Sequence, residues 1–262
     1  MSLGDMQMGS RAESVEAVLV GALLGGAYAE RAGGRARVAL AEAPPPAPSM
    51  AHPGIAAAVL GSGEESAGDG SWVVEAIRTG LARRCDPMAD FIAAGLPPGD
   101  RLQTAAHASV GAAISAAVDG TSMPAIVALA VMAAEEGAQE GSDVAGPDLA
   151  ARIQWACALA SRAEPGPEDV LDLLVGTSAV VQECVPAALA FVAASAAGGR
   201  PAHELVAVAA RLGGAAEIPI IAGGLLMGLQ GLAGVPDTML AEIRERWPTL
   251  TATARDLAES RG

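Results

Sequence analysis

Glycines inside apolar helical stretches constrain the fold of this chain more than any other feature. Apolar residues recur at i, i+3 and i+4 spacing over residues 14–31, which predicts a helix there. Gly21, Gly25 and Gly26 lie inside this helix, and each costs about 1 kcal/mol relative to alanine unless another backbone comes very close. Aromatic residues make up only 2% of the chain, so the core must be packed from Ala, Val, Leu, Ile and Gly. Because long alternating strand patterns are also almost absent, we predict an all-α fold.

The same spacing, broken at glycine and proline, predicts further helices. Pro186 is expected at the first position of its helix, and Trp72 and Trp155 are expected in the core. Residues 41–53 and 61–70 are rich in Pro or Gly and are expected in a surface loop. The expected helices cover residues 71–81, 102–118, 123–137, 148–163, 168–175, 178–184, 186–197, 202–212, 218–235 and, as the last and most charged one, 236–246.

The apolar segment from Ile218 to Val235 is long enough to raise the question of a membrane span. Gln230, the repeated glycines and the lack of flanking aromatic or basic anchors favour a buried core helix, and no membrane partner is expected. We predict one compact, orthogonally packed helical domain over residues 13–262. Residues 1–12 are expected to be a disordered arm or a remnant of an expression vector.

Charge and cysteine usage exclude several classes of function. The net charge is −14, so nucleic-acid binding is not expected. The chain contains no lysine, which excludes a P-loop lysine, a Schiff-base lysine and a Ser–Lys dyad. Cys85, Cys157 and Cys184 are widely spaced and form no disulfide pattern. With no signal peptide at the N-terminus, these features predict a cytoplasmic protein.

Three segments carry a resemblance to a known family. They read GALLGGAYAERAG at 21–33, AGDGSWVVEAIRTGL at 67–81 and RLGGAAEIPIIAGGLLMGLQG at 211–231. In the same order, they resemble the G-A-L-L-G-x-A-x-G-D-A-x-G, T-D-D-T-x-M and L-G-G-D-T-D-T-I-A-A-I-A-G-A-L-x-G motifs of the ADP-ribosylglycohydrolase (DraG-like) family. QECVPAALAFVAA at 182–194 and AHASVGAAISAAVDG at 106–120 resemble two further helices of that family. The resemblance implies an all-helical fold, two Mg²⁺ ions and cleavage of the glycosidic bond that joins ADP-ribose to a side chain.

Most of the family's carboxylates are absent at the matching positions. The family's Thr-Asp-Asp-Thr falls on Gly68-Asp69-Gly70-Ser71, and its Asp-Thr-Asp-Thr falls on Ala215-Ala216-Glu217-Ile218. The aspartate of the first motif falls on Glu30. By resemblance, Glu30, Asp69, Ser71 and Glu217 are therefore the metal-ligand candidates, and Asp69 and Glu217 are the catalytic ones. Since Mg²⁺ requires near-octahedral oxygen ligands, these residues predict one weakly held ion or none.

Each candidate also has a purely structural interpretation. Asp69 and Ser71 could cap the helix that follows them, and Glu217 could stabilise a helix N-terminus through the macrodipole. Glu30 would need a cationic partner at the C-terminal end of its helix. For His107, a hydrogen-bonded core histidine is favoured over a catalytic base.

The resulting expectation is a catalytically impaired family member, a pseudoenzyme that binds an ADP-ribose-like small molecule or a protein partner. Two alternatives stay open. One is an active metal-assisted hydrolase of ADP-ribosyl glycosidic bonds with a rearranged metal site. The other is a crystallin-like structural scaffold on the same fold. A homo-oligomer is compatible with all three.

Overall fold

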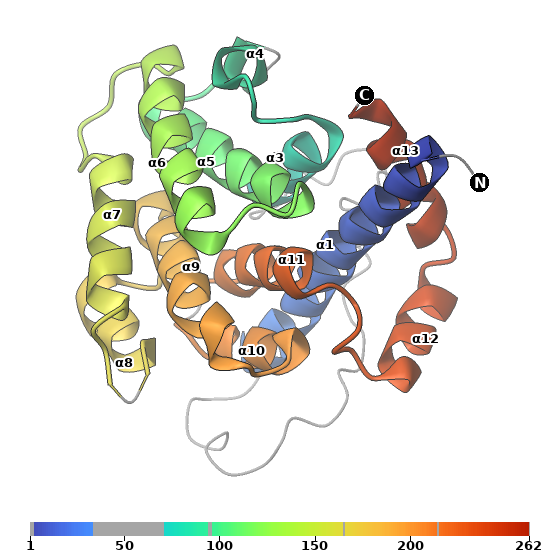
Figure 1. The fold of residues 1–262 in the computed structure, drawn as a ribbon. Coiled ribbons are helices and arrows are strands. Elements are labelled where there is room, and N and C mark those ends of the chain that lie inside the picture. Colours follow the sequence, from blue (N-terminus) through green and yellow to red (C-terminus); the bar gives the residue numbers. More distant parts are fainter. Residues whose placement is uncertain (1–2, 34–70, 94–95, 165, 214, 262) are drawn as a thin grey trace.

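Helices form all of the regular structure in the described part of the chain, which comprises residues 3–33, 71–93, 96–164, 166–213 and 215–261 of this computed structural model (Figure 1). This confirms the predicted all-α class. The longer elements are α1 (Leu3–Gly33), α3 (Ser71–Ala82), α5 (Arg101–Val118), α6 (Met123–Glu140), α7 (Leu149–Ala160), α9 (Val181–Ser195), α10 (Ala202–Ala209), α11 (Glu217–Gln230), α12 (Asp237–Arg246) and α13 (Leu250–Ser260). The shorter ones are α4 (Met88–Ala93), α8 (Glu168–Val170), the π-helix η1 (Leu171–Val175) and the 3₁₀ turn η2 (Ala196–Gly198).

Helices α1 and α11 pack against each other through glycine. A Cβ atom added at Gly21 would lie 2.0 Å from the carbonyl oxygen of Gly223, and one added at Gly223 would lie 2.1 Å from the carbonyl oxygen of Gly21. One added at Gly25 would lie 2.0 Å from the carbonyl oxygen of Pro219. The backbones are therefore in direct contact. This is the close approach that the glycines inside residues 14–31 predict.

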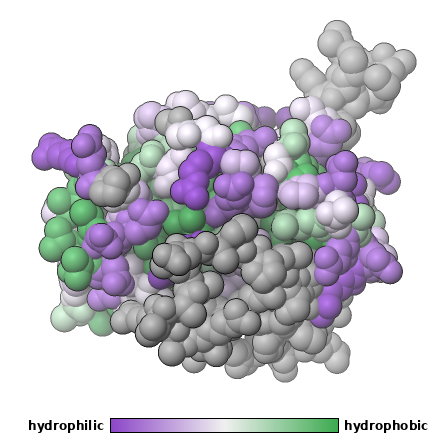
Figure 2. All heavy atoms as spheres, turned by 90° about the horizontal axis from the view of Figure 1, so that it is seen from below, coloured by the Kyte–Doolittle hydropathy of each residue, from purple (hydrophilic) through white to green (hydrophobic). Residues whose placement is uncertain are grey.

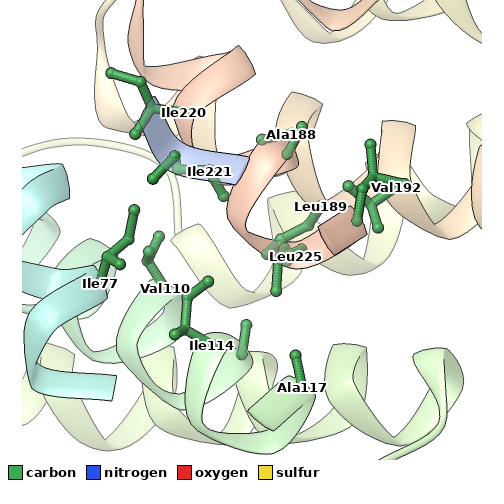
Figure 3. Packing of buried hydrophobic residues seen from close by; sticks show 14 of the residues in the cluster. Ile77, Val110, Ile114, Ala117, Ala188, Leu189, Val192, Ile220, Ile221 and Leu225 are labelled. Atoms are coloured by element: carbon green, nitrogen blue, oxygen red, sulfur yellow. The ribbon is translucent and has the colours of Figure 1, made fainter. Parts of the chain in front are cut away.

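The core lies where α3, α5, α9 and α11 meet, as Figure 3 shows. Ile77 of α3 and Ile114 of α5 face Leu225 of α11, and Leu189 of α9 lies beside it. All four side chains are fully buried. Aliphatic side chains fill this region, in agreement with the low aromatic content.

The apolar segment from Ile218 forms α11, whose residues from Glu217 to Met227 are all buried. It is a core helix, as the sequence predicts. Among the described residues, one helix is long and apolar enough to cross a membrane, Ser10–Ala29 of α1, and 78% of its apolar window is buried inside the protein. Both stretches are buried by contacts with other helices.

Several predicted boundaries differ from the structure. Helix α1 begins at Leu3, so it extends through most of the stretch expected to be an arm. Helices α4 and α13 are additional, and α12 is not the last helix. In α13 the apolar positions are Leu250, Ala254 and Ala258, two of which are alanines that give only a weak periodic signal. The loop expected at 41–53 and 61–70 lies outside the described residues.

The prediction that Pro186 begins a helix is wrong. The segments expected at 178–184 and 186–197 form the single helix α9, with Pro186 inside it. A proline cannot donate to the carbonyl four residues earlier, which here belongs to Gln182. The Arg152 side chain of α7 replaces that donor, because its Nε donates to the Gln182 carbonyl while its Nη2 donates to the Val175 carbonyl.

Trp155 is also not in the core, since 43% of it is exposed. It lies on α7 under the Arg152 guanidinium, 5.6 Å from the ring centroid. Trp72 is half-buried at the start of α3.

Arg261 joins the C-terminal end of the described chain to the C-terminal ends of α3 and α5. Its Nη1 donates to the carbonyls of Gly80, Leu81 and Arg83, and its Nη2 donates to the carbonyl and hydroxyl oxygens of Ser115. It also forms an ion pair with Asp119 at 2.9 Å. The last carbonyls of a helix have no partner inside the helix, so this side chain satisfies carbonyls that α3 leaves open. At α5 it adds a second donor to the Ser115 carbonyl, which also accepts from the Asp119 N–H.

We predict that Gly21→Ala destabilises the protein by about 1–3 kcal/mol or more, because the new methyl group must push α11 away from α1. Helix propensity alone would stabilise the variant by about 1 kcal/mol, which is the opposite sign. Gly198→Ala is the matched control, since nothing lies within 4 Å of its added Cβ. Urea unfolding followed by circular dichroism measures both, and a Gly21→Ala variant as stable as wild type would contradict the proposed contact.

Arg261→Met should lower the free energy of unfolding by about 3 kcal/mol or more, because it leaves the Asp119 carboxylate and several carbonyls without their donor. The control is Arg255→Met, at an exposed position on α13, the helix that ends just before Arg261. Its free energy of unfolding should change by no more than about 0.5 kcal/mol. If the two variants lost the same free energy of unfolding, the hydrogen bonds and ion pair of Arg261 would contribute little to stability.

Candidate functional site

A cavity of about 690 Å³ opens where four helices begin. Its wall contains residues from the first turns of α3, α5, α9 and α11, together with the loops before α5, α7 and α9. The lining residues are Trp72, Glu75, Pro97, Pro98, Asp100, Leu102, Gln103, His107, Val144, Ala145, Ala179, Val180, Val181, Gln182 and Glu217. The volume lies within the range of small-molecule sites, roughly 300–1,000 Å³.

The four helix N-termini give the cavity a positive electrostatic component. Each helix begins with backbone N–H groups that have no partner inside the helix, and its macrodipole places about half a positive charge there. Two of these N–H groups are already used, since the Asp100 carboxylate accepts from the amides of Leu102 and Gln103, each at 2.9 Å. The described lining carries three carboxylates, those of Glu75, Asp100 and Glu217, and no arginine.

Glu217 is the first residue of α11, and only 6% of it is exposed. It lies in the cavity wall, where it places a carboxylate at the helix N-terminus. Its negative charge also acts on Cys184 of α9, because burial first and the charge of Glu217 second raise the pKa of the Cys184 thiol to about 12. The neighbouring Ala215 and Ala216 add no oxygen ligand to this wall.

His107 is the most deeply buried polar group of the cavity wall, with 1% of it exposed. Burial lowers the pKa of His107 to about 4, so the ring is neutral at pH 7. The ring contacts Thr79, whose Oγ1 lies 3.1 Å from Nε2. As predicted, His107 is a packed and hydrogen-bonded histidine.

The hydrogen bonds around His107 show which of its two ring nitrogens has no partner among the described residues. The Thr79 hydroxyl donates its one proton to the carbonyl of Glu75 at 3.0 Å, so it must accept from the His107 Nε2–H. In this tautomer Nδ1 is an acceptor, and it is buried without a hydrogen-bond partner among the described residues.

The other candidates named from the sequence are not placed at the cavity. Asp69 lies outside the described residues. Glu30 belongs to α1 and Ser71 begins α3, but the side chains of both lie outside the described part of the structure. Of the four candidates, only the Glu217 side chain is described, and it lies in the cavity wall.

The donor set of the described residues does not fit a dinuclear Mg²⁺ centre. Among them, no group of three or more His, Cys, Asp or Glu side chains is arranged to hold a metal ion. Mg²⁺ prefers near-octahedral oxygen coordination, and the wall around Glu217 offers alanine where the family motif has aspartate and threonine.

A sequence model of the ADP-ribosylglycohydrolase family matches residues 26–262. This chain belongs to the ADP-ribosylglycohydrolase family. The match covers the segments at 67–81 and 211–231 completely and the segment at 21–33 from residue 26 onward. No curated protein matches the chain. Membership of the ADP-ribosylglycohydrolase family accounts for the helical fold.

Sequence reasoning missed several residues of the cavity wall. Asp100 follows Gly99 and precedes an apolar periodic segment, which is a recognisable helix-capping signal. Gln103 and Gln182 gave no signal, because a lone glutamine near a helix start has no characteristic spacing. Val144 and Ala145 lie in a loop whose position depends on the packing of α5 and α6.

We predict a pH dependence of stability that arises from His107. Its pKa is about 6.5 when unfolded and about 4 when folded, so the unfolded chain binds more protons between these values. Stability is therefore fully present above pH 6.5 and falls as the pH drops toward 4, by about 2 kcal/mol at pH 5. His107→Gln removes this contribution, so urea unfolding should show a smaller loss between pH 7 and pH 5 in the variant. His203→Gln on α10 is the control, and equal losses in wild type and His107→Gln would contradict the assignment.

Proposed function

We propose that this ADP-ribosylglycohydrolase-family protein binds an ADP-ribose-like ligand in the cavity and has lost most of the family's magnesium-dependent hydrolysis. The observation that carries the proposal is the cavity itself. It has the volume of a ligand site and neutral polar side chains, Gln103 and Gln182, in its wall, while the Glu217 segment has alanines at the positions of the family's metal ligands.

The helix N-termini are the feature of the cavity that favours a ligand with a diphosphate. An ADP-ribose diphosphate carries two negative charges, which the three lining carboxylates oppose. The N-termini of α3, α5, α9 and α11 together contribute roughly two positive charges, and their free N–H groups can bind phosphate oxygens. The Asp100 carboxylate already caps α5, so its negative charge and the positive N-terminal end of that helix partly offset each other.

The polar residues of the wall support the ribose part of such a ligand. Gln103 and Gln182 can both donate to and accept from hydroxyl groups. Trp72, Leu102 and Val181 supply apolar surface. The ligand would bind through neutral hydrogen bonds and helix N-termini, with no requirement for a metal ion.

The test is thermal unfolding of the protein with ADP-ribose, with and without excess Mg²⁺. A ligand at 100 times its Kd stabilises the folded state by about 2.7 kcal/mol, which raises Tm by several degrees for a chain of this size. Ala145→Trp places a large side chain in the cavity wall and should abolish the shift. Ala233→Trp, at an exposed position outside the cavity, should retain it.

Each outcome has a distinct meaning. A shift without Mg²⁺ that Ala145→Trp abolishes supports the binding-only pseudoenzyme. If the shift requires Mg²⁺ and ADP-ribosyl bonds are cleaved, with activity lost in Glu217→Gln but kept in Glu204→Gln, the protein is an active hydrolase with a rearranged site. The absence of any shift would reject both, and would leave a crystallin-like scaffold or a protein-binding role.

A further inference from the structure

An exposed apolar surface lies outside the cavity, at the side formed by α7, α8 and η1. Leu173 is 79% exposed, Leu174 is 57% exposed and Trp155 is 43% exposed. Figure 2 shows a hydrophobic area at the left edge of the molecule, where α7 and α8 lie in Figure 1, with hydrophilic residues around it. We call these three residues the η1 surface.

The backbone of η1 holds the two leucines outward. In this π-helical turn the flanking Leu171 and Val175 are buried, whereas the three residues between them, Asp172, Leu173 and Leu174, are exposed. π-Helical turns are rare and frequently occur at functional sites. Arg152 joins the turn to Trp155, because its guanidinium donates to the Val175 carbonyl and lies over the indole ring.

Negative charge borders the η1 surface. Glu164, Glu168, Asp169 and Asp172 lie within nine residues of one another along the same segment, and all are at least partly exposed. The described residues form two ion pairs, Arg244–Glu16 and Arg261–Asp119, and neither involves these four carboxylates. An apolar surface beside unneutralised carboxylates favours a partner with apolar and basic residues together.

Charge also distinguishes between the partners that could bind the η1 surface. A second copy of this chain would bring four more carboxylates against these four, and its net charge of −14 opposes self-association. Anionic membrane surfaces are repelled for the same reason. We propose that the η1 surface docks a basic amphipathic helix of a partner protein, with its apolar side on Leu173, Leu174 and Trp155 and its Lys or Arg residues against the carboxylates.

This interaction is independent of any ligand in the cavity. The two sites are nevertheless connected along the chain, because residues 176–180 lead from η1 to Ala179 and Val180 in the cavity rim. Thr177 anchors that connection by donating to the Asp172 carboxylate at 2.8 Å.

The test uses a short fluorescein-labelled peptide of leucine and lysine in amphipathic helical register, with fluorescence anisotropy as the readout. A second peptide with glutamate at every lysine position is the charge control. Wild-type protein should bind the lysine peptide and not the glutamate peptide. The double variant Leu173→Ser/Leu174→Ser should raise Kd at least about tenfold, since central apolar contacts dominate such interfaces.

Met132→Ser is the matched control, because Met132 is a 48% exposed apolar residue on α6 that is not one of the three residues of the η1 surface. Glu168→Gln/Asp169→Asn should weaken binding and reduce its salt dependence. Equal Kd values for wild type and the leucine double variant would overturn the proposal, since binding would then reflect the overall negative charge. A second outcome would also overturn the proposal. If the wild-type protein dimerises in sedimentation velocity, the leucine double variant does not, and the two bind the peptide with the same Kd, then the η1 surface binds a second copy of this chain.

Discussion

Two helix backbones touch at Gly21 and Gly223, and the effects of that contact extend to the cavity. Glu217 begins the same helix fewer than two turns before Gly223, so the distance between α1 and α11 decides where its carboxylate lies. Helices α9 and α10 pack on α11 in turn. A larger side chain at the crossing would move the cavity wall together with the core. The glycines at this crossing therefore determine the position of Glu217 in the cavity wall as well as the contact between α1 and α11.

The cavity combines features that normally belong to different sites. Helix N-termini favour anions, whereas the carboxylates of Glu75, Asp100 and Glu217 disfavour them. Cations between carboxylates and substrate would resolve this conflict, but the described donor set does not fit a pair of magnesium ions. In the proposed binding-only role, helix N-termini and neutral hydrogen-bonding groups such as Gln103 and Gln182 would hold the ligand instead.

The sequence predicts the fold class and most helices, because periodic apolar spacing and glycine breaks are local signals. Helix α13 was missed because alanine at positions 254 and 258 gives little amphipathic contrast. The role of Arg261 could not be predicted, since its acceptors lie more than a hundred residues away in sequence. For the site, the family motifs indicated Glu217, while Asp100 and His107 reach the cavity wall only through tertiary packing.

The pairing of Pro186 with Arg152 restricts the order in which relatives can change. If Pro186 is replaced first, α9 regains its own donor, and the Gln182 carbonyl simply accepts two hydrogen bonds. If Arg152 is lost first, that carbonyl has no donor from either side. The two positions should therefore covary, with the proline lost before the arginine along any lineage.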